Sequence, residues 1–451
     1  MHRYLRFFIL MLTTMIFIQT NAVTAQPQII ILTWENVVGR SLHDNIGLQI
    51  MNQDYRSQKL SEWNALSNFM PTINYQGMMV NNLELPVFVF MGEKIQVGTD
   101  YNFQHTLQLS LPVFNGGLRW ANWKAQRILK KSLNEELSAA TDATVLNGLQ
   151  AYFGIILANS MTAVTQEAVD AAKANMDDVQ QFFNEGAASN LDLQRAKAQY
   201  FSTLPQLESA RNRKKITANQ LKYILNISIS DSLVISDSLS QMNFLKEYES
   251  KSLAELTEFA YQNRPEIKSI GYQAEAVNQQ KNIIRSKFLP TLALSADVTH
   301  QAQINTSNIA KEDYIRVKTV GISLQLPLFE GGKRAIEFQQ AQLENNKMQL
   351  MKKQVYEQIN METEQSYYSY QEAIKNLRSL KQTMVQAHES LRLSNLMYKE
   401  GMSTQVEVLN AQLFYTQSNV NYQEGVYNFN VSQLALLKSI GKIKTIWEVN
   451  R

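Results

Sequence analysis

The chain of 451 residues has no cysteine, and only 17 glycines and 8 prolines interrupt it. Without cysteine it can form no disulfide, carry no lipid on an N-terminal cysteine and use no thiolate chemistry. Its stability must therefore come from packing. The scarcity of glycine and proline disfavours a fold of many short elements and predicts long ones.

Long hydrophobic runs are also missing beyond the N-terminus. Residues 7–18 form an apolar run of about a dozen residues, which follows Arg3 and Arg6 and precedes small residues at 23–25. This pattern predicts a secretory signal peptide over residues 1–25. A membrane anchor is the alternative, although the run is short for a spanning helix. No later stretch approaches the roughly twenty apolar residues of such a helix.

The chain also has almost no excess of charge of either sign, because 43 lysines and arginines are balanced by 40 aspartates and glutamates. The net charge of +3 becomes +1 when the two arginines of the expected signal peptide are subtracted (3 − 2 = 1), so we expect no nucleic-acid partner. No phosphate-binding glycine loop and no metal-like histidine spacing is found, and we expect neither a cofactor nor enzyme activity. The five histidines are scattered: His2, His43, His105, His300 and His388. For His105 and His300, which fall near expected strands, we expect an interfacial role.

What the sequence does contain is an internal duplication. Residues 109–117 read LSLPVFNGG and residues 324–332 read LQLPLFEGG, and a long helical pattern follows each segment. Gly186 and Gly401 lie 215 residues apart, as do Pro112 and Pro327 (327 − 112 = 215). Constant spacing over about seventy residues predicts one structural unit present twice.

Alternating segments predict two β-hairpins, at about residues 71–114 and 290–329. From Tyr101 to Leu111 every second residue is apolar or aromatic, and the residues between them are amides or hydroxyls. One apolar and one polar face suit a wall between two solvents, although a strand of a soluble sandwich shares this pattern. We expect loops at 80–97 and 301–313, and a strand over 314–328. Arg316 and Lys318 fall on the apolar face of that strand, so we expect it to leave the membrane before them.

Helical periodicity predicts two long helical hairpins, at about 117–226 and 332–438. About 66 residues at roughly 1.5 Å each give a rod of about 100 Å, and Pro205 predicts a kink or a local break. Helices are also expected over 31–69, interrupted near residue 45, and over 252–287, restarting at Pro265.

These elements divide the chain into five parts, within which each repeat combines short helices, a β-hairpin and a long helical hairpin. The parts are a signal peptide (1–25), a first repeat (26–226), a linker (227–251), a second repeat (252–440) and a C-terminal tail (441–451).

Four strands are too few for a membrane barrel, which must have no open edge and needs about eight strands at least. Several copies must then share one barrel, and physics alone leaves open whether two copies supply eight strands or three supply twelve.

The ordered, duplicated landmarks resemble those of the TolC-like outer membrane efflux proteins. The resemblance rests on the two Leu-Pro-x-Phe-x-Gly-Gly segments, on Gly186 and Gly401 with the acids after them, and on the run Asn263-Arg264-Pro265-Glu266. The resemblance implies an α+β membrane protein in the outer membrane of a Gram-negative cell. Three copies would share a twelve-stranded β-barrel, and their helical hairpins would form a periplasmic α-barrel.

The resemblance also implies a function and partners. The chain would be the outer membrane channel of a tripartite efflux or type I secretion system, a passive exit duct for small toxic compounds or exported polypeptides. Its partners would be its own copies, a periplasmic adaptor protein, an inner-membrane pump of the RND or ABC type, and the lipids of the outer membrane. A periplasmic coiled-coil scaffold or tether without channel activity is the alternative, but it leaves the two amphipathic hairpins without a role.

Three groups of site residues follow from the resemblance. The expected adaptor-docking tips are Gly186, Ala187, Ala188, Ser189, Gly401, Met402, Ser403 and Thr404. The expected entrance gate is Asp192, Tyr398, Glu407 and Asn410, where Asn410 replaces an acid of the family and an expected arginine near Ser403 is missing. The expected junction between barrel and helical tunnel is Pro112, Gly116, Gly117, Pro327, Gly331 and Gly332. Helix-start preference explains the two acids equally well, and backbone freedom the glycines.

Overall fold

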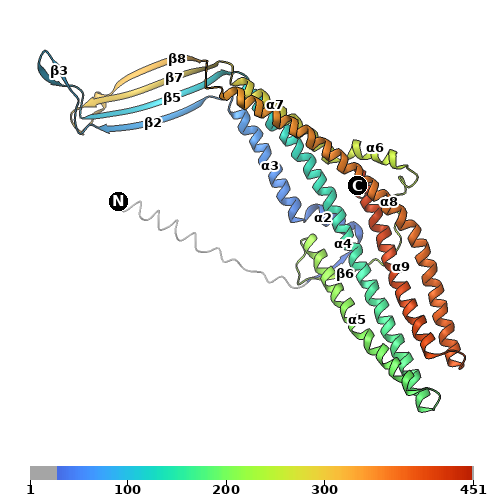
Figure 1. Cartoon of the computed structure of the whole chain (residues 1–451). Coiled ribbons are helices and arrows are strands. Elements are labelled where there is room, and N and C mark those ends of the chain that lie inside the picture. The colour runs from blue at the N-terminus through green and yellow to red at the C-terminus, as the bar shows by residue number, and fades with distance from the viewer. Residues whose placement is uncertain (1–27, 449–451) are drawn as a thin grey trace, which may run out of the picture.

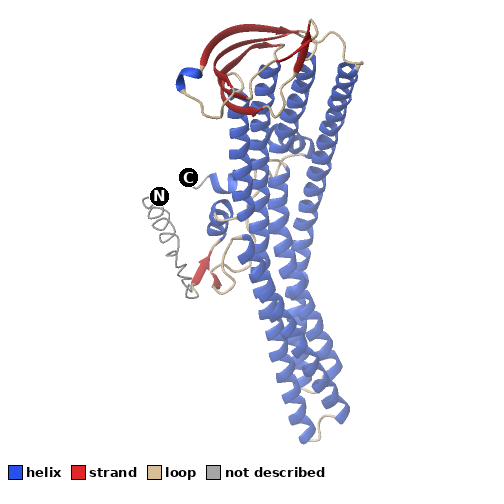
Figure 2. Cartoon of the chain, turned by 90° about the vertical axis from the view of Figure 1, so that its left-hand side faces the viewer, coloured by secondary structure: helices blue, strands red, loops and turns tan. Residues whose placement is uncertain are grey.

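The computed structural model describes residues 28–448 (Figure 1). The expected signal peptide, residues 1–25, and the end of the tail lie outside these described residues. The described part is elongated, with a curved antiparallel sheet at one end and long helices running away from it (Figures 1 and 2). No helix within this part is both long and apolar enough to cross a membrane.

Two equivalent helix pairs make up the length of the molecule. The longer helices, α4 (Leu118–Asn184) and α8 (Lys333–Lys399), have 67 residues each, and the shorter ones, α5 (Asn190–Ile224) and α9 (Gln405–Ser439), have 35 each. Each helix of the second pair starts 215 residues after its equivalent (333 − 118 = 215; 405 − 190 = 215). Pro205 lies inside α5, which continues through it, so the local break suggested by the sequence is wrong.

Shorter helices complete the bundle next to the sheet. α3 (Ile46–Ser67) packs on α4, and α7 (Pro265–Ser286) packs on both α4 and α8 (Figure 1). Two still shorter helices precede them, α2 (Trp34–His43) and α6 (Leu253–Asn263). The interruption expected near residue 45 is present, because the Asn45 side chain accepts a hydrogen bond from Leu48 N and caps α3.

Four antiparallel strands form the sheet in the order β2-β5-β7-β8. They are β2 (Thr72–Asn81), β5 (Tyr101–Asn115), β7 (Thr291–Ile304) and β8 (Ile315–Gln325). The two hairpins of the duplicated halves therefore meet at β5 and β7, and β2 and β8 are left as edges. The ladder between β5 and β7 shifts register between Pro112 and Phe114, as expected where a proline removes a donor.

The register of the sheet collects the apolar residues on one face. Leu107 lies opposite Tyr75 on one side and Val298 on the other, and Leu294 lies opposite Ile322. Because side chains alternate between faces, the amides and hydroxyls of the same strands fall together on the opposite face. The separation of apolar and polar faces predicted from the alternation is confirmed.

The ends of β8 differ from the prediction. The strand starts at Ile315 instead of Tyr314 and includes Arg316 and Lys318, as predicted; they lie opposite His300 and Val298. It stops at Gln325, and residues 326–328 lie beyond it. Gln325 lies opposite Thr291, the first residue of β7, so Pro327 has no partner strand to pair with.

Two small sheets were not predicted. β1 (Ile29–Leu32) pairs in parallel with β6 (Ser232–Ile235), so residues 31 and 32 belong to a strand and not to a helix. The expected loop at 80–97 contains the antiparallel pair β3 (Val87–Phe90) and β4 (Glu93–Gln96). The other loop holds a single 3-10 turn, η1 (Lys311–Asp313), and a last short helix, α10 (Thr445–Glu448), ends the described chain.

The main core lies at mid-length, where the linker crosses the helices. Tyr152 is fully buried there, and its hydroxyl donates to an Asp237 carboxylate oxygen at 2.5 Å. From α9, Asn430 and Gln433 hydrogen-bond the backbone of the linker: each carboxamide oxygen accepts from a backbone N–H at 2.9 Å, from Met242 and Phe244 respectively. These contacts fix the segment that joins the two repeats.

Candidate functional site

The turns at the far end of the helical hairpins have the same geometry twice. α4 ends at Asn184 and α8 at Lys399, and Gly186 and Gly401 follow with φ of 78° and 74°. Glycine accepts this left-handed conformation without steric cost. In the first turn the N–H of Ala187 donates to Phe182 O at 2.7 Å, and in the second Met402 donates to Met397 O at 2.8 Å. Both turns are Schellman motifs.

A hydroxyl residue starts the returning helix in each turn. Ser189 caps α5 by accepting from Asp192 N at 3.1 Å, and Thr404 caps α9 by accepting from Glu407 N at 3.3 Å. No side chain stands within 4 Å of the place where a Cβ on Gly186 or Gly401 would lie. The eight expected tip residues therefore lie, four in each, in the two five-residue connections 185–189 and 400–404, whose conformation follows from the local sequence.

Of the four expected gate residues, the two acids are bound within their own turns. Asp192 accepts from the Ser189 hydroxyl at 2.6 Å and lies 3.7 Å from Arg195. Glu407 accepts from the Ser403 hydroxyl and from Thr404 N, and these two donors hold the pKa of the Glu407 carboxyl below its usual value.

The other two gate residues lie outside the turns, Tyr398 on α8 and Asn410 on α9. Tyr398 is half-buried against a small cluster of Val179, Leu193 and Ala196, and its ring meets Phe182 edge-on at 5.8 Å. Burial and then the charge of Asp192 raise the pKa of Tyr398. Among residues 28–448 no hydrogen bond joins these two side chains. Asn410 is exposed on α9.

A pair that the sequence did not single out does link the two hairpins near this end. Lys399 Nζ lies 3.5 Å from an Asp178 carboxylate oxygen, between α8 and α4, and both side chains are about half exposed. No local pattern predicts this pair, because its partners lie in different repeats.

At the sheet end, each long helix starts directly after a duplicated Gly-Gly pair, whose second glycine is the N-cap. All four glycines have φ between 61° and 86°: Gly116, Gly117, Gly331 and Gly332. At position 116 glycine is also required sterically, since a Cβ there would lie 2.4 Å from the carbonyl oxygen of Ser286. At the other three no atom stands within 4 Å, so backbone conformation alone requires glycine.

Arginines two residues after each Gly-Gly pair reinforce these junctions. Arg119 lies over the Phe69 ring at 5.1 Å and donates to Asn68 O at 3.1 Å. Arg334 lies over the Phe288 ring at 5.1 Å and donates to a backbone carbonyl at 3.2 Å. Each arginine thus ties the start of a long helix to the end of the shorter helix beside it. The motif Gly-Gly-x-Arg occurs in both repeats, and this duplication could have identified the two arginines from the sequence.

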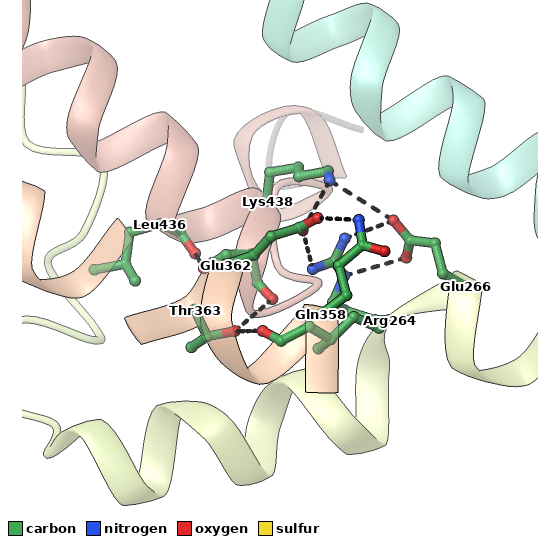
Figure 3. A network of polar contacts seen from close by, with 9 residues as sticks. Arg264, Glu266, Gln358, Glu362, Thr363, Leu436 and Lys438 are labelled. Atoms are coloured by element: carbon green, nitrogen blue, oxygen red, sulfur yellow. Dashed lines mark hydrogen bonds and ion pairs between the residues drawn. The ribbon is translucent and has the colours of Figure 1, made fainter. Parts of the chain in front are cut away.

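A buried charge network joins α6, α7, α8 and α9 at mid-length (Figure 3). Arg264, whose side chain is only 3% exposed, forms two hydrogen bonds to Glu266, at 2.7 and 3.2 Å, and one to Glu362 at 2.6 Å. Lys438 lies 3.7 Å from both carboxylates. Burial favours the neutral acids, but the bonds and charge of Arg264 outweigh it and lower the pKa of both.

Comparison with known proteins adds relatives that share this architecture. The outer membrane efflux protein family matches residues 65–226 and 256–442. Outer membrane protein TolC of Escherichia coli is 24% identical over 356 residues, which cover 75% of this chain and 69% of TolC. Alkaline protease secretion protein AprF of Pseudomonas aeruginosa is 22% identical over 328 residues, 71% of this chain and 66% of AprF. The crystal structure of the Campylobacter jejuni CmeC outer membrane channel has a TM-score of 0.76 at 18% identity, over 92% of this chain and 88% of that one.

Proposed function

Because this chain belongs to the outer membrane efflux protein family, we propose that it is the outer membrane channel of a tripartite efflux or type I secretion system. It acts as a passive exit duct for small toxic compounds or exported polypeptides. Its sheet lies in the outer membrane and its helices extend into the periplasm. An adaptor and an inner-membrane pump supply the cargo and the energy.

The main structural support for this proposal is the pair of unpaired edge strands of the sheet. In a four-stranded antiparallel sheet the first and last strands run in opposite directions, and here these are β2 and β8. The β8 edge of one copy can therefore pair antiparallel with the β2 edge of the next, as a membrane barrel without edges requires. Three copies give the twelve strands that the family resemblance implies (3 × 4 = 12).

The duplicated turns are the proposed adaptor contacts. Among residues 28–448 they are the points most distant from the sheet (Figure 1), and their backbone is already fixed by Schellman motifs and hydroxyl caps. A partner that docks on Gly186 or Gly401 meets a preformed surface and pays little ordering entropy. The residues beside these glycines, 187–189 and 402–404, complete the contact.

The proposed gate lies just inside these turns. Threefold symmetry brings three copies of Asp192, Tyr398, Glu407 and Asn410 near the axis, and three carboxylates of one kind attract cations. With Asn410 neutral, the ring at the start of α9 holds only the Glu407 charge. The Lys399–Asp178 pair supplies a polar link between the hairpins in this region.

Reconstitution of the purified trimer in a planar lipid bilayer tests the proposal. We expect heat-modifiable trimers in the outer-membrane fraction and discrete single-channel currents. A chain that stays in the periplasm, or that gives no current, is instead the coiled-coil scaffold or tether.

A pair of glycine variants tests the docking surface. Gly401→Arg should abolish export while trimers and currents persist, because the side chain projects into space that the adaptor occupies. Gly92→Arg is the matched control: Gly92 has φ of 88° and open space around it, but lies between β3 and β4 at the opposite end. Normal export from Gly401→Arg trimers would refute the assignment.

A further inference from the structure

The apolar face of the sheet carries positive charge in one place only. Along its four strands, within the described residues, the charged side chains of this face are Arg316 and Lys318, and no acid shares the face. Both belong to the start of β8, next to the end of β7. A face that meets lipid along most of its length therefore has a cationic upper border.

Neighbouring strands bring aromatic and imidazole groups to the same place. His105 and His300 lie directly opposite each other in the ladder, and Arg316 lies opposite His300. An open depression is lined by five residues, which we call the outer-rim cluster: His105, His300, Lys311, Tyr314 and Arg316.

Tyrosine hydroxyls hold one histidine of the outer-rim cluster in position. The two ring nitrogens of His105 lie 2.8 Å from the Tyr75 hydroxyl and 3.1 Å from the Tyr314 hydroxyl. This three-residue chain crosses from β2 to the segment before β8 and fixes the wall of the depression.

The positive groups of the cluster have no acidic partner. Among residues 28–448, Lys311 and Arg316 form no ion pair, and none of the lining residues is an acid. The nearby Asp313 carboxylate accepts a hydrogen bond from Ala310 N at 2.8 Å. The depression therefore presents unpaired cations and N–H donors, as an anion site requires.

The height of the cluster places it at a membrane interface. His300 lies nine residues along β7 from Thr291 (300 − 291 = 9), or about 30 Å of strand. At the usual tilt of about 40° this is about 23 Å along the membrane normal, close to the roughly 25 Å apolar band of a membrane barrel. The helices leave from the other end of the sheet, so the cluster faces the outer leaflet.

We propose that the outer-rim cluster binds a phosphate group of a phosphorylated glycolipid in the outer leaflet. Arg316 and Lys311 supply charge, the His300 ring N–H and the Tyr314 hydroxyl donate to phosphate oxygens, and the acyl chains lie on the apolar rows below. This inference rests on the proposed function, since it requires the sheet to be in the outer membrane.

Purified trimers in phosphatidylcholine nanodiscs test it, with diphosphoryl lipid A as the probe and native mass spectrometry as the readout. Each basic charge removed should weaken binding about fivefold. We expect this loss for Arg316→Gln and a larger one when Lys311→Gln is added. Arg316→Lys should retain most of the binding. The matched control is Lys94→Gln, which removes the same charge from β4 and should bind as the wild type does.

Two further probes identify the source of the phosphate. Dephosphorylated lipid A should bind equally weakly to wild type and to Arg316→Gln. Inorganic phosphate should not displace diphosphoryl lipid A at comparable concentration. Displacement by inorganic phosphate would assign the site to a free anion, and equal lipid A binding by wild type and the double variant would refute the site. Single-channel currents recorded in parallel report the proposed function separately, because the cluster lies on the outer face and its variants should conduct normally.

Discussion

Replacing Arg264 by methionine should destabilise the protein through charge alone, because methionine keeps much of the buried volume. The change leaves Glu266 and Glu362 buried without the guanidinium that forms three hydrogen bonds to them. Breaking a buried ion pair in this way costs about 3–5 kcal/mol. We expect about 3 kcal/mol, the lower end, because Lys438 remains 3.7 Å from both carboxylates.

The loss should depend on pH in a defined direction. In the folded wild type, Arg264 lowers the pKa of both carboxyls below the value of 4.5 expected in the unfolded chain. A lowered folded pKa gives stability that is present above the unfolded value and is lost as the pH falls through the folded one. The difference between wild type and variant should therefore be full near neutral pH and shrink below about pH 4.5.

Urea unfolding of the trimer in detergent, followed by far-ultraviolet circular dichroism, measures this difference. Arg392→Met is the matched control, since Arg392 also bonds a glutamate, Glu389, at 2.7 and 2.8 Å, but its side chain is 57% exposed. It should unfold as the wild type does. If Arg264→Met is as stable as wild type, or loses equal stability at acidic and neutral pH, the network does not act through its charges.

Three further predictions concern other parts of the molecule. Burial raises the pKa of Asp142 to about 6 from 3.8, so Asp142→Asn should raise the free energy of unfolding by about 3 kcal/mol above pH 6 and by less than about 1 kcal/mol near pH 4; a constant gain in urea titrations would contradict this. Arg119→Met and Arg334→Met should each cost about 2 kcal/mol of unfolding free energy, since each loses a charged hydrogen bond and a cation–π contact; strongly unequal losses would show that the two junctions are not equivalent. Lys399→Gln should lengthen single-channel openings by less than about fivefold, because its ion pair with Asp178 is exposed, and Tyr398→Phe should leave them unchanged, because its hydroxyl holds no partner among residues 28–448.

Much of the fold could be predicted because its signals are local. Gly186 and Gly401 stand where a helix must end in a left-handed turn, and the hydroxyls of Ser189 and Thr404 stand where the next helix must begin. The alternation from Tyr101 to Leu111 sets which residues share a face whatever the neighbouring strand is. Pro205 is an exception: the local break that it suggested is absent, since the neighbouring α4 packs along α5 and supports the helix where the proline removes a hydrogen bond.

The rest depended on contacts between distant segments. The pairing of β1 with β6, the Lys399–Asp178 link and the outer-rim cluster each join residues more than two hundred positions apart or from different repeats. No periodicity records such a pairing, because each segment is compatible locally with several partners. Arg119 and Arg334 are an intermediate case. Their duplication is visible in the sequence, but their contacts with Phe69 and Phe288 are known only from the structure.

The sequence by itself determined the duplication, the long helices and the two-faced hairpins, since turn residues and side-chain periods act over a few residues at a time. Only the tertiary structure decided which edges stay open, where the buried charges of Arg264, Glu266 and Glu362 meet, and that His105, His300 and Arg316 form one surface. Strand register and helix packing bring those groups together, and these depend on the whole chain burying its apolar faces at once.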